Sequence, residues 1–146
     1  MIEDIEINQL KIISTEGGDV LHGIKASEKQ FDGFGEAYFS TVNNGAVKVW
    51  KKHLKMTLNL MVPVGKVGFV FFDDREDSQS INTFQSLVIS TENYYRLTVP
   101  PGIWFGFKGL SEDKNLLLNV ANIEHDPDEA VNRPIHEIKY DWSSVR

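Results

Sequence analysis

The chain is built from short segments in which apolar residues alternate with polar ones or form brief unbroken runs. The segments are separated by Gly, Pro, Asn and Asp, an arrangement typical of β-strands joined by turns. No segment of normal helix length repeats its apolar residues every three or four positions. The pattern predicts an all-β fold with strands at residues 5–14, 20–24, 36–42, 46–53, 57–64, 66–73, 84–90, 94–99, 103–107 and 115–123.

Turn residues predict how these strands pair. Asn-Gly tolerates positive φ, so residues 43–45 are expected to close a tight hairpin between the strands on either side. The two apolar strands joined at residues 64–65 are expected to form a second, central hairpin. The segments 84–90 and 94–99 are expected to pair with each other.

Length and composition bound the domain organisation. The chain has 146 residues, of which 41% are hydrophobic, and this is enough for one domain with a substantial core. We expect a single domain, 1–146, with a barrel core at about 34–124. After Ile123 the composition turns polar, and the C-terminal tail, 125–146, is expected to wrap the barrel or a partner subunit.

Charge and cysteine content narrow the classes of function. With a net charge of −6 and dispersed basic residues, the chain lacks the positive field of a nucleic-acid binder, so no nucleic-acid partner is expected. No apolar run approaches the roughly 18 residues of a membrane span, so no membrane contact is expected. The lack of cysteine suits a reducing compartment, and the expected location is cytoplasmic. The acidic run at 73–77 is expected to be a solvated loop.

The run GAVKVWKKHLKMTLNLMVPVG, at 45–65, is similar to the first half of the cupin metal motif, in which a glycine precedes a His-x-His pair. Lys51 and His53 occupy that pair. In the second half of the motif, Pro-x-Gly-x-x-His, the histidine is replaced by Phe105. A divalent metal is usually held by at least three side-chain ligands, and a single imidazole remains. We therefore expect neither a metal nor another cofactor.

From 35 to 142 the chain resembles the dTDP-4-dehydrorhamnose 3,5-epimerase and sugar-nucleotide ketoisomerase branch of the cupins. The resemblance lies in GEAYFSTVNNGAVKVWKKH, VGKVGFVFFDDR, VPPGIWFGFKGL and the ending YDW. It implies a cupin jelly-roll β-barrel that forms a homodimer. It also implies action on a nucleoside-diphosphate keto-sugar in the biosynthesis of a surface polysaccharide such as lipopolysaccharide.

The resemblance assigns roles to positions where this chain departs from the family. The epimerases carry an Arg-Gly-x-His segment that supplies the catalytic base and an arginine for the nucleotide diphosphate, and the segment here is KVWK, at 48–51. The base position is thus Lys51, and Lys48 is the cation in place of the arginine. The tyrosine acid of the family would fall near Leu118. Tyr94 and Tyr95 offer another possible acid, but the sequence does not favour one of the two over the other.

Strand alternation joins these residues into one hypothesis. It places Lys51 and His53 on one face of their strand and Lys48 on the other. If the first face lines the barrel, burial lowers the pKa of Lys51 and makes it a candidate base. His53 could then take or return the proton next to a ketone. Asn59 or Asn119 could donate hydrogen bonds to the oxyanion.

Two functions remain open from the sequence. In the first, the chain is a metal-independent epimerase or ketoisomerase with Lys51 and His53 as catalytic residues. Its substrate-binding residues are Lys48, Asn59, Trp104, Phe105 and Asn119, with the aromatic rings stacking on the nucleotide base or sugar. In the second, the chain is a non-catalytic cupin that binds a sugar nucleotide or a biosynthetic partner enzyme. The two catalytic candidates are then solvated surface residues, and the large rings pack in the core or at a dimer interface.

Overall fold

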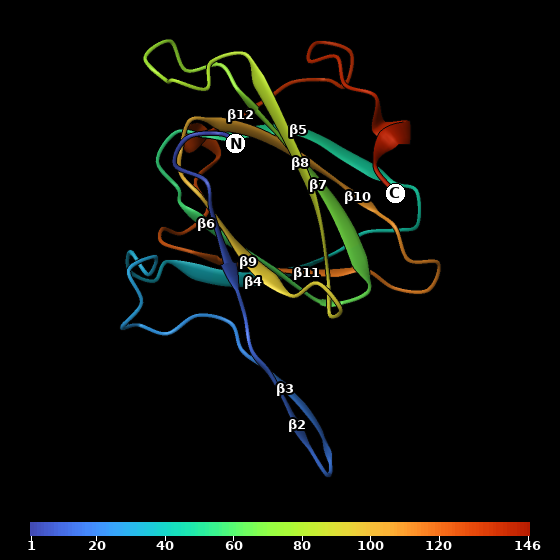
Figure 1. Ribbon diagram of the computed structural model, residues 1–146. Coiled ribbons are helices and arrows are strands. Elements are labelled where there is room, and N and C mark those ends of the chain that lie inside the picture. Colours follow the sequence, from blue (N-terminus) through green and yellow to red (C-terminus); the bar gives the residue numbers. More distant parts are fainter.

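The computed structural model describes residues 1–146 and shows two antiparallel β-sheets that face each other, with a two-stranded hairpin projecting from them (Figure 1). Two single-turn 3₁₀ helices, η1 (Pro127–Glu129) and η2 (Trp142–Ser144), lie in the C-terminal tail. The all-β jelly-roll prediction is confirmed. The strands are β1 (Glu6–Gln9), β2 (Ile12–Thr15), β3 (Gly18–Leu21), β4 (Glu36–Thr41), β5 (Val47–His53), β6 (Leu58–Val64), β7 (Lys66–Asp73), β8 (Thr83–Ser90), β9 (Tyr95–Val99), β10 (Ile103–Gly109), β11 (Leu116–Ala121) and β12 (Ala130–Asn132).

The helical content is confined to those two short turns, and neither has the length or the apolar character needed to cross a membrane.

The two sheets combine strands that are far apart in the sequence. The first sheet has the order β1-β9-β6-β11-β4, and the second has the order β12-β5-β10-β7-β8. The three expected hairpins are therefore wrong, because β4 and β5, β6 and β7, and β8 and β9 lie in different sheets. Gly45 and Gly65 do adopt positive φ, 74° and 81°, but these turns carry the chain from one sheet to the other. A turn sequence sets the local backbone, and it does not choose the strand that the chain pairs with afterwards.

The main apolar core lies between the two sheets. It is made by the inward-facing residues of both, as expected for two packed sheets whose side chains alternate in and out. Leu58 and Leu60 come from β6 of the first sheet, and Phe69 and Phe71 come from β7 of the second. All four side chains are buried, so this layer supplies the hydrophobic stabilisation that holds the sheets together.

A second apolar layer covers the outer face of the second sheet, and we call it the outer layer. Trp50 of β5 and Trp104 of β10 pack there against Ile138, Trp142 and Val145 of the C-terminal tail. The tail therefore wraps the barrel of its own chain, which is one of the two positions expected from the sequence.

The barrel extends beyond the limits of 34–124 expected from the sequence. β1 pairs with β9, and β12 pairs with β5, so both ends of the chain contribute edge strands to the sheets. Edge strands carry more polar residues than central ones, because one side of the strand lacks a neighbour. The polar composition of β12 concealed it in the sequence. The single strand expected at 5–14 is two strands, with β1 in the first sheet and β2 in the projecting hairpin.

A β-bulge in β5 changes which side chains face the interior. β5 and β10 pair through Lys51 with Phe105 and through Lys48 with Phe107, so two residues of β5 lie opposite the single residue Gly106 of β10. The extra residue turns Lys48 to the same side as Lys51. Strict alternation placed Lys48 on the opposite face, and the structure corrects that expectation.

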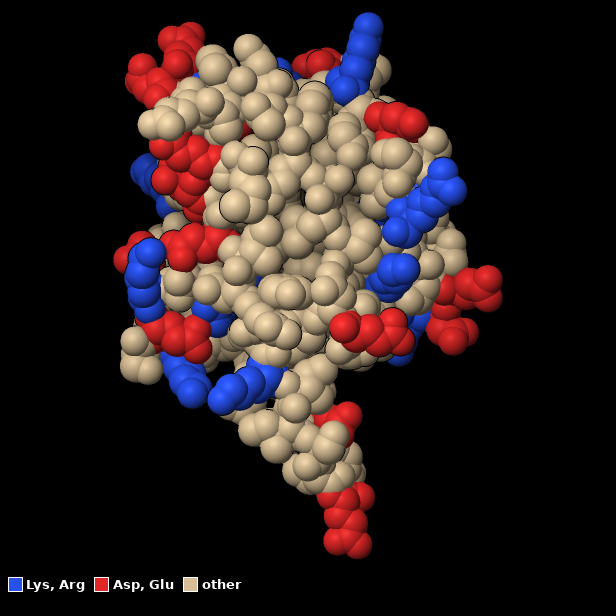
Figure 2. All heavy atoms as spheres, in the orientation of Figure 1, with Lys and Arg blue, Asp and Glu red and all other residues tan.

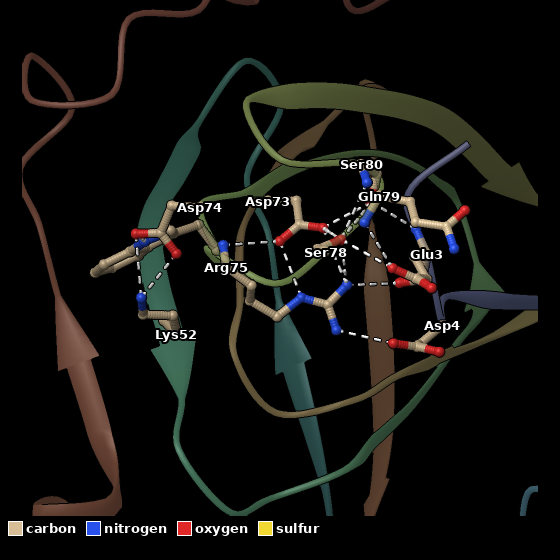
Figure 3. Close-up of polar contacts among 10 residues, drawn as sticks. Glu3, Asp4, Lys52, Asp73, Asp74, Arg75, Ser78, Gln79 and Ser80 are labelled. Carbon is tan, nitrogen blue, oxygen red and sulfur yellow. Dashed lines mark hydrogen bonds and ion pairs between the residues drawn. The ribbon is translucent and has the colours of Figure 1, made fainter.

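The acidic run at 73–77 is more than the solvated loop that was expected. Asp73 is fully buried, and Arg75, Ser78 and Ser80 donate hydrogen bonds to its carboxylate at 2.9, 2.6 and 2.7 Å (Figure 3). Arg75 also donates to the carboxylate of Asp4 at 2.9 Å. This cluster, which we call the Asp73 cluster, ties the N-terminal segment to the loop between β7 and β8.

The projecting hairpin of β2 and β3 stands clear of the two sheets (Figure 1). Its side chains Ile13 and Val20 are 47% and 51% exposed. Figure 2 shows acidic side chains at its tip, and both signs of charge scattered over the rest of that face of the molecule. The hairpin therefore presents apolar side chains on its sides and negative charge at its end.

Candidate active site

A cavity of about 250 Å³ opens between the two sheets. Its walls come from β4, β6 and β11 of the first sheet and from β5, β10 and β12 of the second. Apolar walls combined with convergent polar groups are typical of small-molecule sites, and six apolar side chains line this cavity: Val49, Leu58, Leu60, Phe105, Phe107 and Leu117. The polar lining residues are Tyr38, Ser40, Lys48, Lys51, His53, Asn119 and Asn132.

His53, the last residue of β5, is held on both sides. It is 5% exposed, and its Nδ1 forms a hydrogen bond with the carboxylate of Glu129 at the end of η1. The other carboxylate oxygen of Glu129 accepts hydrogen bonds from the amides of Met56 and Lys55 at 3.2 and 3.3 Å. The imidazole also stacks on Phe105, which lines the cavity as expected, with ring centroids 6.0 Å apart. These contacts fix the orientation of the imidazole.

Burial and hydrogen bonding set the charge of this pair. Burial alone would favour the neutral acid at Glu129, but the hydrogen bonds from His53 and the Met56 amide outweigh it and hold the pKa of Glu129 below its usual value. Burial lowers the pKa of His53, and the neighbouring carboxylate opposes this shift only in part. At neutral pH the pair is therefore a carboxylate beside a neutral imidazole.

The position of the imidazole proton follows from this charge state. An ionised carboxylate can only accept hydrogen bonds, so Nδ1 of His53 carries the proton and Nε2 carries a lone pair. Nε2 makes no hydrogen bond, and it is not one of the buried polar atoms that lack a partner. It is therefore reachable from the cavity, where a basic nitrogen can accept a proton from a bound molecule.

Two lysines of β5 line the same cavity. Lys51 is half-buried, and its positive charge adds to burial in lowering the pKa of His53. Lys48 is exposed, and its Nζ donates to the carbonyl of Thr41 at 3.0 Å and lies 5.9 Å from the centre of the Phe107 ring. The structure thus brings together Lys51, His53 and Lys48, three of the residues expected at the site.

Asn119 of β11 and Tyr38 of β4 contribute to the opposite wall. They are cross-strand partners, and Nδ2 of Asn119 donates to the hydroxyl oxygen of Tyr38 at 3.0 Å. Oδ1 of Asn119 accepts a hydrogen bond from the backbone amide of Asn59 at 3.1 Å. Asn119 therefore lies in the cavity, as expected, and is held at both ends of its amide group.

Two residues expected to bind substrate lie outside the cavity. Asn59 faces the outer side of the first sheet, where its Oδ1 accepts from the Thr98 hydroxyl at 2.8 Å. Trp104 is fully buried in the outer layer, where its Nε1 donates to Asp74 at 2.7 Å. The expectation was wrong for both, because their neighbours along β6 and β10 take the inward positions. Asn59 reaches the site only through its backbone.

Glu129 and Tyr38 were not predicted from the sequence as residues of the site. Glu129 belongs to a polar segment 76 positions from His53, and its local signal is the Asp126 cap followed by Pro127 at the first turn. That signal predicts a short helical turn, but it does not predict that Glu129 contacts His53. Tyr38 lies in a predicted strand, but alternation alone could not decide which face of that strand points into the barrel.

The position expected for a tyrosine acid, Leu118, is a leucine that does not line the cavity, although both its neighbours in β11 do. The phenol that reaches the cavity comes instead from the adjacent strand.

The donor set of the cavity does not suit a divalent metal. His53 is its one imidazole, Glu129 occupies Nδ1 of that ring, and the Lys51 ammonium lies in the same lining. No group of three His, Asp or Glu side chains is arranged to hold a metal ion. The cavity instead combines a lone pair on nitrogen, a cation and hydrogen-bond donors, which together can remove a proton next to a carbonyl group and stabilise the resulting oxyanion.

The chain is similar to proteins of known structure and to curated proteins. No protein-family model matches the chain. The crystal structure of a dTDP sugar isomerase from Desulfovibrio desulfuricans G20 is similar over 99% of this chain and 94% of that one, with 34% identity and a TM-score of 0.95. The Haloferax volcanii protein named "Probable low-salt glycan biosynthesis epimerase Agl13" is 28% identical over 88% of this chain and 85% of its own length.

A more distant structure shares the fold. It is the dTDP-6-deoxy-D-glucose-3,5-epimerase RmlC from Legionella pneumophila, solved in complex with dTDP-4-keto-L-rhamnose. The match has a TM-score of 0.81 and 21% identity, and it covers 90% of this chain and 73% of that one.

Proposed function

We propose that this chain, which belongs to the family of dTDP-sugar isomerases and dTDP-4-dehydrorhamnose 3,5-epimerases, catalyses the epimerisation or ketoisomerisation of a nucleoside-diphosphate keto-sugar. The observation that carries the proposal is the buried pair of His53 and Glu129, which presents a basic nitrogen to the cavity. The name of the Haloferax volcanii relative supports a place in glycan or surface-polysaccharide biosynthesis.

The reaction begins at the carbon next to the sugar ketone. Nε2 of His53 removes the proton from that carbon, and the electron pair of the C–H bond passes into an enolate. The Lys51 ammonium lies in the same cavity and stabilises the negative oxygen. Glu129 stabilises the imidazolium that forms on His53. Return of a proton to the opposite face of that carbon gives an epimer. If the neighbouring hydroxyl proton instead moves to the enolate oxygen and the former carbonyl carbon takes up the proton, the product is the isomeric ketone.

The size and charge of the cavity support a sugar nucleotide as the substrate. Its volume of about 250 Å³ lies below the roughly 300–1,000 Å³ of pockets that enclose a drug-sized ligand, so it suits a sugar ring better than a whole nucleotide. Lys48 is the exposed cation of the lining, and we assign it to the diphosphate. The nucleotide then lies outside the cavity.

Deuterium exchange tests the proposal. The protein is incubated in D₂O with a dTDP-linked 4-keto-6-deoxy sugar, and proton NMR follows the hydrogen on the carbon next to the ketone. An enolising enzyme replaces that hydrogen with deuterium at a rate proportional to its concentration. A parallel thermal-shift measurement reports binding, because a ligand of the folded state raises the melting temperature. Binding without exchange would contradict the proposal and indicate a non-catalytic cupin.

Two adjacent lysines give a matched pair of variants. Lys51 lines the cavity, whereas Lys52 points to the other side of β5 and forms an ion pair with Asp74 at 2.9 Å. Lys51→Ala is expected to slow exchange by about 10²–10³-fold, the usual cost of losing one oxyanion-stabilising group. Lys52→Ala is expected to keep the wild-type rate per folded molecule. Equal rates for the two variants would contradict the role of Lys51.

We also propose that the chain forms a homodimer in the cytoplasm. The projecting hairpin exposes Ile13 and Val20, and Phe39 of the edge strand β4 is 63% exposed, so apolar side chains are available for a second copy. The lack of cysteine suits a reducing compartment. Light scattering coupled to size-exclusion chromatography measures the molar mass, and a monomer at micromolar concentration would contradict the dimer.

A further inference from the structure

We propose that Gly106 and Trp142 are positioning residues for Lys48, and that together they hold the β-bulge that turns this lysine into the cavity. The inference rests on the proposed function, in which Lys48 binds the diphosphate of the substrate. Neither Gly106 nor Trp142 lines the cavity. The affinity for the nucleotide part of the substrate is therefore set in part from the outer face of the second sheet.

Gly106 lies where the bulged strand comes closest to its neighbour. Val49 and Trp50 of β5 are the two residues opposite it. A Cβ atom at position 106 would lie 2.5 Å from Cγ1 of Val49 and 3.1 Å from the carbonyl oxygen of Lys48. The φ of Gly106 is outside the left-handed region, so its backbone conformation does not require glycine. Space requires it, because the bulge occupies the volume of a side chain.

The C-terminal tail packs against the outer side of the bulge. Cζ2 of Trp142 would lie 3.1 Å from the same Cβ atom, and the Trp142 ring is 5.5 Å from the fully buried ring of Trp50. Lys108 of β10 holds this part of the tail, since its Nζ donates to the carbonyl oxygens of Trp142 and Val145 at 2.9 and 3.1 Å. The bulge therefore cannot move outward without displacing the Trp142 ring.

The inner side of the bulge presents Lys48 to the cavity. In a regular strand, positions 48 and 51 point to opposite faces, and the extra residue of the bulge places both on the inner face. If β5 relaxed to regular pairing, its register would shift by one residue and Lys48 would turn to the outer layer. The packing of Gly106 and Trp142 against the bulge opposes that shift.

Binding of dTDP, which carries the diphosphate and no sugar, tests the inference on the full chain by isothermal titration calorimetry. Lys48→Ala is expected to weaken binding by about 10–100-fold, the usual cost of losing a hydrogen bond to a charged group. Gly106→Ala is expected to cause a similar loss, because the added methyl group displaces the bulge. The double variant is expected to bind no more weakly than Lys48→Ala, since both changes remove the same contact.

Gly68→Ala is the matched control. A Cβ atom at Gly68 would lie 2.2 Å from Cγ1 of Val145, so this change also disturbs the tail, but Gly68 belongs to β7, whose pairing is regular on both sides. We expect it to bind dTDP with wild-type affinity. Trp142→Ala tests the bulge without adding atoms and is expected to weaken binding, whereas Trp104→Ala, the size-matched change in the outer layer, is expected to leave it unchanged. Thermal melting verifies that each variant is folded.

Kinetics separate positioning of Lys48 from general damage to the site. With a dTDP-linked 4-keto-6-deoxy sugar in D₂O, Gly106→Ala is expected to raise KM for exchange and to keep the rate at saturation, because Lys51 and His53 are paired beyond the bulge.

The possible results distinguish this inference from the proposed function. Wild-type dTDP affinity in Gly106→Ala and Trp142→Ala, or additive losses in the double variant, would overturn the inference and leave the assignment of Lys48 intact. A lower rate at saturation with unchanged KM would overturn it as well. If the wild-type protein did not bind dTDP, or if Lys48→Ala bound it with wild-type affinity, the assignment of Lys48 to the diphosphate would also be wrong.

Discussion

The two faces of the second sheet are made by the same strands, yet their polar groups are arranged in opposite ways. On the outer face, Trp104 donates to Asp74 at 2.7 Å, Lys52 pairs with Asp74 at 2.9 Å, and the C-terminal tail covers the strands. On the inner face, Nε2 of His53 has no hydrogen-bond partner and is reachable from the cavity, while Glu129 holds the rest of the ring in place.

Within β5, the side chains of the outer face are therefore expected to contribute to stability, and those of the inner face to the chemistry of the cavity. A polar group in a folded protein is normally paired, and an available lone pair inside an oriented, nearly buried side chain is the exception. β5 supplies both situations because its side chains point to the two faces, with the bulge shifting Lys48 to the inner one. Substitutions on the two faces are therefore expected to have different effects.

The largest expected effect is on the inner face. His53→Gln removes the basic nitrogen and is expected to reduce deuterium exchange next to the ketone by about 10²–10⁴-fold, the usual contribution of a general base. His136→Gln serves as the control, because His136 is an exposed residue of the tail. NMR exchange rates for the two purified variants provide the measurement. If His53→Gln exchanged as fast as His136→Gln, the inner face would have no catalytic base at this position.

The matching change on the outer face is expected to act on stability. Trp104→Ala removes a fully buried ring and is expected to lower the free energy of unfolding by about 3–5 kcal/mol. The exchange rate per folded molecule is expected to stay near that of the wild type, since Trp104 does not line the cavity. Urea denaturation and NMR measure the two quantities. A large loss of exchange in fully folded protein would show that the two faces are coupled.

Glu129→Gln refines the comparison. It replaces the carboxylate that holds His53 with a neutral amide of the same size. Loss of a hydrogen bond to a charged group costs about 2 kcal/mol, which corresponds to a fall of about 30-fold in kcat if it acts on the transition state. Glu129 raises the pKa of His53 against the effect of burial, so its removal lowers that pKa further.

The pH dependence of the rate distinguishes this positioning role from a purely structural one. The wild-type base is neutral above a pKa that burial has moved below about 6.5, the ordinary value for histidine, and its rate falls only as the pH drops through that lowered pKa. In Glu129→Gln this fall in kcat/KM is expected at a still lower pH. An unchanged pH profile with a lower rate would mean that the glutamate contributes nothing to the basicity of His53.

The smallest expected effect concerns the Asp73 cluster, which lies at the end of β7 and does not line the cavity. Burial would favour the neutral acid at Asp73, but hydrogen bonds from Arg75, Ser78 and Ser80 outweigh it and hold the pKa of Asp73 well below its usual range. A lowered folded-state pKa stabilises the protein above the unfolded pKa of about 3.9, and this contribution is lost as the pH falls below that value.

Asp73→Asn is therefore expected to lower the free energy of unfolding at pH 7 by about 1–3 kcal/mol and to leave exchange next to the ketone unchanged. The difference from the wild type is expected to shrink as the pH falls below about 4. Urea denaturation at several pH values measures it. A difference that stayed constant down to pH 3 would contradict the stabilising role of the ionised carboxylate.

Much of the fold could be predicted because its signals are local. Alternation of apolar residues located eleven of the twelve strands approximately, with β1 and β2 merged into one segment. The resemblance to the epimerase and ketoisomerase family is confirmed by the comparisons. The pairing of strands could not be predicted, since the turns at Gly45 and Gly65 carry the chain between sheets. Lys51, His53 and Asn119 line the cavity because they follow alternation, as does Phe105.

The sequence by itself determined the approximate positions of the strands and of the turns between them, because each depends on neighbouring residues. Only the tertiary structure decided that Glu129 meets His53 across 76 positions, and that Tyr38 and Asn119 face them from the other sheet. Pairing of this kind depends on the register of distant strands. No short stretch of the chain encodes that register, which emerges only when the two sheets pack together.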